Sequence, residues 1–192
     1  DQASVLGLKQ TPELLTENFI EIERITTLST HSSWLVKRSV YGKLKGYRCV
    51  DCCEDYDFLL RSLQAGIKVG RIADPLVCYR FHEGSISADG YRIQRNIARI
   101  LNDSFKRGIE IASISPEDMN RRGRETDSFN DEELSEARGL LGDFSVLYSQ
   151  GRLSAAAVHA LKGCFVSKAF RSVFFEEAMR QAKLKYALRK LR

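Results

Sequence analysis

The clearest hydrophobic pattern in the chain begins at Glu54. Apolar side chains recur there at the spacing of one helix face, at Tyr56, Leu59, Leu60 and Leu63. Asp57 can pair with Arg61 one turn later, and Gly66 provides a C-terminal stop. The pattern therefore predicts a helix from Glu54, with acidic residues in the first turn, where the helix dipole favours negative charge. Further helices are expected over residues 38–44 and 93–105.

Other apolar segments are typical of strands. Residues 19–36 are rich in Ile, Thr, Val, Leu and Trp and are interrupted by the polar residues 30–33, which predicts two short strands around a turn. Residues 67–72 and 76–81 are also predicted as strands, separated at Pro75, which cannot continue a central strand. The first half of the chain is therefore expected to have an α/β fold.

The second half has a different pattern. Residues 113–133 are polar, which favours a linker or loop. Asn130 is a plausible N-cap with Glu133 three residues later, and helical periodicity follows to the end of the chain. We therefore predict a mixed α/β part over residues 1–112, a polar linker over 113–133 and an all-helical C-terminal extension over 134–192.

Composition and charge add two expectations. The 192 residues are 43% hydrophobic and 29% charged, which fits a packed protein, and five cysteines, an odd number, favour reduced thiols in the cytoplasm. The formal net charge is +5, and its excess collects in the acid-free residues 180–192. The helix containing them either packs on the core or lies on an anionic membrane, in which case Phe174, Leu184, Leu188 and Leu191 would contact lipid. No nucleic-acid motif accompanies this segment, so nucleic acid is not an expected partner.

Two short motifs carry the candidate chemistry. The sequence has no phosphate-binding glycine loop, metalloprotease helix or nucleophile elbow. It does have an acidic cluster, Asp51-Cys52-Cys53-Glu54-Asp55-Tyr56-Asp57, and a second motif, Tyr79-Arg80-Phe81-His82, some twenty-five residues later. A Gly84-Ser85-Ile86-Ser87 loop follows.

Together these motifs resemble the C-terminal half of the catalytic domain of family 2 glycosyltransferases, over roughly residues 15–108. The resemblance implies the acceptor-side half of a GT-A fold and an enzyme that transfers a sugar, with inversion, from a nucleotide-sugar to a glycan or lipid-linked acceptor. It implies that Asp55 is the general base, which must accept a proton as the acceptor hydroxyl attacks. Glu54 would bind the acceptor or the sugar, and Arg80 and His82 would face the donor diphosphate.

The resemblance also implies a divalent metal, Mg or Mn, with His82 as a candidate ligand. The Asp-x-Asp motif and the nucleotide-binding half of the family should precede these residues and are not in this chain. The chain is therefore expected to be part of a larger enzyme or to have lost catalysis. The alternative is a non-catalytic interaction module that binds through its basic helical tail. The expected location is the cytoplasm, peripherally at the inner face of the membrane.

Overall fold

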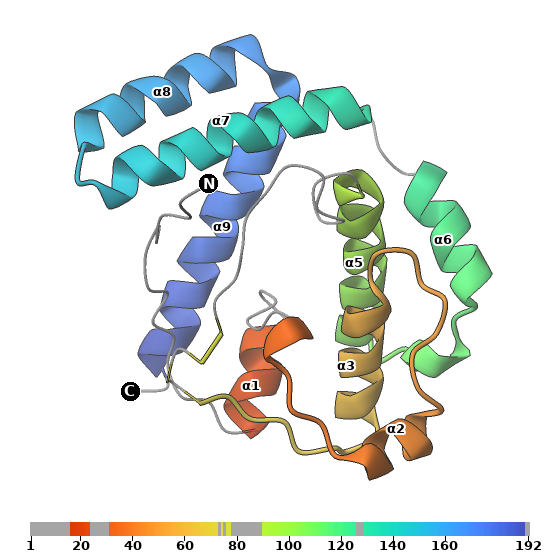
Figure 1. Ribbon diagram of the computed structural model, residues 1–192. Coiled ribbons are helices and arrows are strands. Elements are labelled where there is room, and N and C mark those ends of the chain that lie inside the picture. The colour runs from red at the N-terminus through yellow and green to blue at the C-terminus, as the bar shows by residue number, and fades with distance from the viewer. Residues whose placement is uncertain are drawn as a thin grey trace, which may run out of the picture.

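The computed structural model describes residues 16–23, 31–72, 74, 76–77, 90–125 and 129–190 (Figure 1). Within these ranges the chain forms eight α-helices and two short 3₁₀ helices. The α-helices are α1 (Thr16–Glu23), α2 (Arg38–Leu44), α3 (Glu54–Gln64), α5 (Tyr91–Lys106), α6 (Pro116–Glu125), α7 (Asp131–Ser149), α8 (Leu153–Val166) and α9 (Lys168–Lys190). The 3₁₀ helices are η1 (His31–Ser33) and η2 (Ile111–Ser113).

The predicted α/β fold is wrong, and with it the GT-A half-fold. Residues 19–23, expected in a strand, belong to α1, where Phe19 and Ile22 are buried one turn apart. Residues 67–72 have no regular structure except a lone bridge at Arg71. A short apolar run is compatible with a buried helix face as well as with a strand. Composition alone therefore led to the wrong prediction of strands for these residues. Of the strand expected over 76–81, residues 78–81 lie outside the described part of the chain.

The larger of two hydrophobic cores is built around α3 and α5. The face of α3 predicted from the sequence is buried in it, and the helix ends at Gln64, before Gly66 with its positive φ of 72°. Val50 and Ile111 from the connecting segments complete the packing. The buried members are Phe19, Ile22, Val50, Cys53, Tyr56, Leu59, Leu60, Leu63, Ile97, Leu101, Phe105, Ile111, Met119 and Ala187.

Helix α6 occupies much of the segment that we expected to be a polar linker. Met119 is fully buried, and Gly123 lies so close to α5 that a Cβ atom there would be 2.5 Å from Ile97. The buried Asn96 amide also donates to the Gly123 carbonyl oxygen at 3.0 Å. Only one narrow face of α6 packs against the rest of the protein, so most of its residues are polar. This polar composition is why residues 116–125 were not predicted to be a helix.

The smaller core lies where α7, α8 and α9 pack together (Figure 1). Its buried residues are Leu134, Ala137, Ala169, Phe170 and Val173. Helix α7 begins with the predicted cap: the Asn130 side chain accepts from the Glu133 backbone N–H at 2.9 Å, and the Glu133 carboxylate accepts from the Asn130 N–H at 2.9 Å. The helical character expected for residues 134–192 is confirmed for the described residues up to 190.

Helix α9 joins the two cores. Figure 1 shows it running from α7 and α8 towards α1. Phe174 packs on the smaller core, whereas Leu184 and Leu188 pack on the larger one. The apolar positions proposed to contact lipid are therefore used in packing, except Leu191, which lies outside the described residues. None of the helices described here is long and apolar enough to cross a membrane.

Candidate functional site

Three acids of the cluster predicted from the sequence, Glu54, Asp55 and Asp57, lie in the first turn of α3, whereas Asp51 precedes the helix and pairs with Arg124. Glu54 is exposed and Asp55 is half-buried, and both lie at the positive end of the helix dipole. One oxygen of Asp55, Oδ1, accepts a hydrogen bond from the Tyr56 backbone N–H at 2.7 Å. Both predicted acids are therefore at a helix N-terminus and in contact with solvent.

Asp57, the last acid of the cluster, has a different environment. Its side chain is fully buried and accepts from Arg61 Nε at 2.8 Å, which confirms the ion pair predicted along the helix. Arg48, which the sequence did not indicate, binds the same carboxylate through Nε and one terminal nitrogen. Arg61 then donates to the carbonyl oxygens of Leu44 and Gly46 at 2.8 and 2.9 Å. Asp57 is therefore a structural residue that fixes the end of α2 against α3.

Arg48 extends this network to η2. It donates to the carbonyl oxygens of Ile111 at 3.0 Å, Ala112 at 3.2 Å and Ile114 at 2.8 Å. Arg48 and Arg61 thus donate hydrogen bonds to the Asp57 carboxylate and to several backbone carbonyl oxygens around it. The Asp57 network therefore connects α2, α3 and η2.

Aromatic side chains gather beside this turn, in a group that we call the aromatic cluster: His31, Trp34, Tyr41, Tyr47 and Phe58. The Tyr47 hydroxyl lies 2.8 Å from His31 Nε2 and 2.9 Å from the Tyr41 hydroxyl. Tyr41 stacks on Phe58, with ring centroids 4.9 Å apart. The cluster was not predicted, since its members come from η1, α2, α3 and the intervening segments.

The acids and the aromatic cluster act on one another electrostatically. Burial raises the pKa of the Tyr47 phenol well above its usual value, as do the hydrogen bond and charge of Tyr41 and, more weakly, the charges of Asp55 and Glu54. Tyr47 therefore stays protonated at neutral pH and remains a hydrogen-bond donor. The result is a surface where ring faces, a phenol and two carboxylates lie together.

The cysteines next to the site differ in accessibility. Cys49 is exposed, whereas Cys53 is buried and its Sγ donates to the Gln94 carbonyl oxygen at 3.3 Å. Burial, followed by the charge of Asp55, raises the pKa of the Cys53 thiol well above its usual value. Burial and the charge of Asp51 also raise the pKa of Cys52. The cysteines in the described part of the chain, Cys49, Cys52, Cys53 and Cys164, are all free thiols.

The expected Mg or Mn ion finds no ligand set in the described residues. No group of three or more His, Cys, Asp or Glu side chains among them is placed to hold a metal ion. Asp57, the most buried acid of the cluster, is already occupied by two arginines. Arg80 and His82, the other predicted site residues, lie outside the described residues. These residues do not fit the metal, so the chemistry proposed below uses none.

Comparisons with protein-family models, curated proteins and solved structures found no match to this chain.

Proposed function

We propose that this chain provides the acceptor side of an inverting glycosyltransferase, which moves a sugar from a nucleotide-sugar to a glycan or lipid-linked acceptor. The proposal rests on the motif resemblance of residues 54–57 and 79–87 and on the local arrangement at the start of α3. It does not use the α/β fold that the resemblance implied. Asp55 is the proposed general base, and Glu54 is proposed to bind hydroxyl groups of the acceptor.

The observation that carries the proposal is the separation of roles among neighbouring acids. Asp57 is buried and neutralised by Arg48 and Arg61, so a substrate cannot reach it. Asp55 is half-exposed, and its Oδ2 accepts no hydrogen bond from any residue that the structure describes. A general base must reach the proton that it removes, and among the acids of α3's first turn Asp55 and Glu54 meet this condition.

The aromatic cluster supports an acceptor that is a sugar. A pyranose ring has a face of C–H groups that packs on an aromatic ring and an edge of hydroxyl groups that donate to carboxylates. Tyr47 is 37% exposed, and its ring lies 4.9 Å from that of Phe58, the residue that follows the first turn of α3. We therefore propose that the acceptor sugar packs against Tyr47 and Trp34, with its reactive hydroxyl directed towards Asp55.

The proposed step balances without another reactant. Asp55 accepts the proton of the acceptor hydroxyl group. At the same time the oxygen of that hydroxyl group forms a bond to the anomeric carbon of the donor sugar. The bond from that carbon to the diphosphate breaks on the opposite face, and the nucleoside diphosphate leaves with the electron pair. In this proposal Arg80 and His82 would stabilise the charge of the departing diphosphate, which would reach them from the donor side.

The test is a transfer assay on the natural full-length protein. It uses radiolabelled UDP-, GDP- and dTDP-sugars as donors, and glycans and polyprenyl-phosphate-linked sugars as acceptors. Asp55→Asn should lower turnover by about 10²–10⁴-fold. Tyr47→Ala should mainly raise the KM for the acceptor. Asp103→Asn, an exposed acid on α5, is the matched control and should leave both values unchanged.

Thermal unfolding of each variant shows whether it folds. A folded Asp55→Asn protein that transfers sugar at a rate within about tenfold of wild type would refute Asp55 as the base. A wild-type protein that is folded but transfers no sugar from any donor would instead favour the non-catalytic interaction module.

A further inference from the structure

Helix α8 has apolar side chains on every side, although half of it faces solvent. Its inner face is made of small residues, Ala156, Ala160 and Gly163, which pack against α7 and α9. Its outer face carries large apolar side chains instead. A helix that is apolar all round is normally buried, so the exposed half of α8 is expected to contact another apolar phase.

The outer face carries a strip of large apolar side chains, with Lys162 one helical turn from both Val158 and Val166. Val158, Leu161 and Phe165 follow one another at helical spacing and are 51%, 65% and 92% exposed, and Val166 beside them is 81% exposed. Figure 1 shows α8 at the periphery of the molecule, on the far side of α7 and α9 from α3. We call these four residues the α8 strip. No described helix covers it.

Basic residues surround the strip and acidic residues are absent from it. The sequence has no Asp or Glu between Asp143 and Glu176. In the same interval it has four strongly basic residues: Arg152, Lys162, Lys168 and Arg171. Arg152 precedes α8, Lys162 lies within it one turn from Val158 and Val166, and Lys168 and Arg171 follow at the start of α9. The exposed apolar side chains are therefore flanked by positive charge alone.

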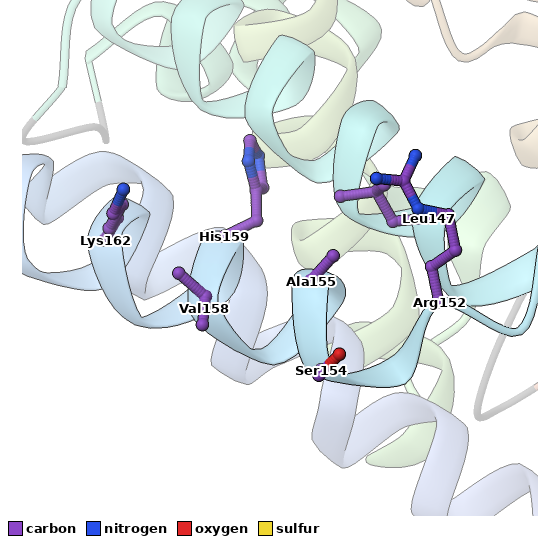
Figure 2. Close-up of a pocket in the computed structure, with 7 residues that line it drawn as sticks. All are labelled: Leu147, Arg152, Ser154, Ala155, Val158, His159 and Lys162. Atoms are coloured by element: carbon purple, nitrogen blue, oxygen red, sulfur yellow. The ribbon is translucent and has the colours of Figure 1, made fainter.

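A shallow groove of about 450 Å³ runs along that edge, between α7 and α8 (Figure 2). Leu147 lines it from α7, and Arg152, His159 and Lys162 line it from the α8 side. His159 Nε2 lies 3.0 Å from the Leu140 carbonyl oxygen. Arg152 and Lys162 are exposed and form no ion pair with any residue that the structure describes. The groove thus places two available cations beside the apolar strip.

We propose that the α8 strip is a membrane-docking surface, which lies in the interface of a bilayer containing anionic phospholipid. Val158, Leu161, Phe165 and Val166 enter the boundary between headgroups and acyl chains, while Arg152, Lys162 and Lys168 bind lipid phosphates. Long basic side chains can extend from an apolar surface to the headgroups, and phosphate oxygens match their charge. The proposal is independent of sugar transfer. It also replaces residues 180–192 as the membrane contact, because Leu184 and Leu188 are used in the larger core.

The test is co-sedimentation of the full chain with vesicles. Phosphatidylcholine vesicles should bind weakly, and vesicles with about one third phosphatidylglycerol should bind strongly at about 0.1 M salt and less at about 0.5 M. Leu161→Ser with Phe165→Ser should lower the affinity at least tenfold, on the order expected for the loss of an apolar strip. Leu35→Ser with Tyr186→Ser, which removes two similarly exposed apolar side chains elsewhere, is the matched control and should bind normally.

The charges are tested in the same way. Lys162→Gln with Lys168→Gln should weaken binding by about 10–25-fold, since each lysine near an anionic surface contributes about a fivefold effect, or about 1 kcal/mol. Lys183→Gln with Lys185→Gln removes the same charge from the other end of α9 and should have a smaller effect. A larger effect of this control pair would return the membrane contact to residues 180–192 and overturn the proposal.

A second measurement places the helix directly. The chain has one tryptophan, so Phe165→Trp in a Trp34→Phe background reports on the strip alone. Its fluorescence should shift to the blue on anionic vesicles and be quenched by brominated acyl chains. Absence of quenching, or binding independent of lipid charge, would refute the proposal. A dimer that the Leu161→Ser, Phe165→Ser variant abolishes, with no vesicle binding, would assign the strip to self-association instead.

Discussion

Asp57 is expected to be the most important single side chain for the stability of the site. The prediction concerns Asp57→Asn, which keeps the shape of the side chain and removes its charge. Arg61 and Arg48 would then lose the negative charge that both bind, and one of the two acceptor oxygens would be replaced by an NH₂ group. Because the carboxylate is fully buried, water cannot replace it in the folded protein.

The size of the stability loss depends on how many interactions of Arg48 and Arg61 remain after the negative charge is removed. Removing one partner of a buried ion pair typically costs about 3–5 kcal/mol. Arg48 is 19% exposed, and both arginines keep their hydrogen bonds to backbone carbonyl oxygens, so the lower end of the range applies. We expect a loss of about 3 kcal/mol in the free energy of unfolding. For a chain of this size that lowers Tm by about 6–12 °C.

The assay is chemical and thermal unfolding of wild type and variant, followed by far-UV circular dichroism. Asp118→Asn is the matched control, since Asp118 pairs with Arg121 on the exposed surface of α6. Exposed pairs contribute little, so this control should lose less than about 1 kcal/mol. Equal losses for the two variants, or a loss below about 1 kcal/mol for Asp57→Asn, would refute the structural role of the buried carboxylate.

Two further predictions concern packing and thiol chemistry. Iodoacetamide at about pH 8 should modify Cys49 first and Cys53 only on unfolding, because Cys53 is buried and its raised pKa keeps it protonated. Peptide mapping measures the two rates, and equal rates would contradict this prediction. Gly163→Ala should destabilise the protein by about 1–3 kcal/mol, because its Cβ would lie 2.5 Å from the buried Phe170 ring. Gly142→Ala, with open space around its Cβ, should stabilise α7 by about 0.5–1 kcal/mol; equal changes in Tm for the two glycine variants would refute the packing argument.

The sequence predicted the helices with a strong period and clear ends. The helix starting at Glu54 was predicted from its apolar face, and the one starting after Asn130 from its capping box. Each has a continuous buried face and a local stop or start signal, so tertiary contacts reinforce the local preference. Residues 38–44 were also placed correctly as a helix.

The errors arose where local signals were weak or misread. Residues 19–23 were assigned to a strand from their β-branched and aromatic side chains, although Phe19 and Ile22 have helical spacing. Residues 113–133 were predicted to be a linker because they are polar, but Pro116 at a first helical position, followed by Glu117, is a helix start signal. The α/β fold was predicted from these strand-like segments and the resemblance implied the same fold, so neither source corrected the other.

The candidate site could be predicted only in part. The pairing of Asp57 with Arg61 was predicted from its spacing along a helix and is confirmed, whereas the roles of Asp55 and Glu54 stay predictions from the motif. The aromatic cluster could not be predicted, because its contacts join residues far apart in the sequence. His31 Nε2, for example, lies 2.8 Å from the Tyr47 hydroxyl, sixteen residues away. Contacts of this kind depend on how helices and loops pack, which periodicity does not specify.

The most direct test of the account is chemical rescue of the proposed base. Asp55→Gly in the natural full-length protein removes the carboxylate and leaves space in which a small anion can act as the base. The account predicts that this variant transfers sugar about 10²–10⁴-fold more slowly than wild type, that azide or formate restores part of the rate, and that Asp55→Asn, which leaves no space, is not rescued. Equal rates for Asp55→Gly with and without azide would contradict the assignment of Asp55 as the general base.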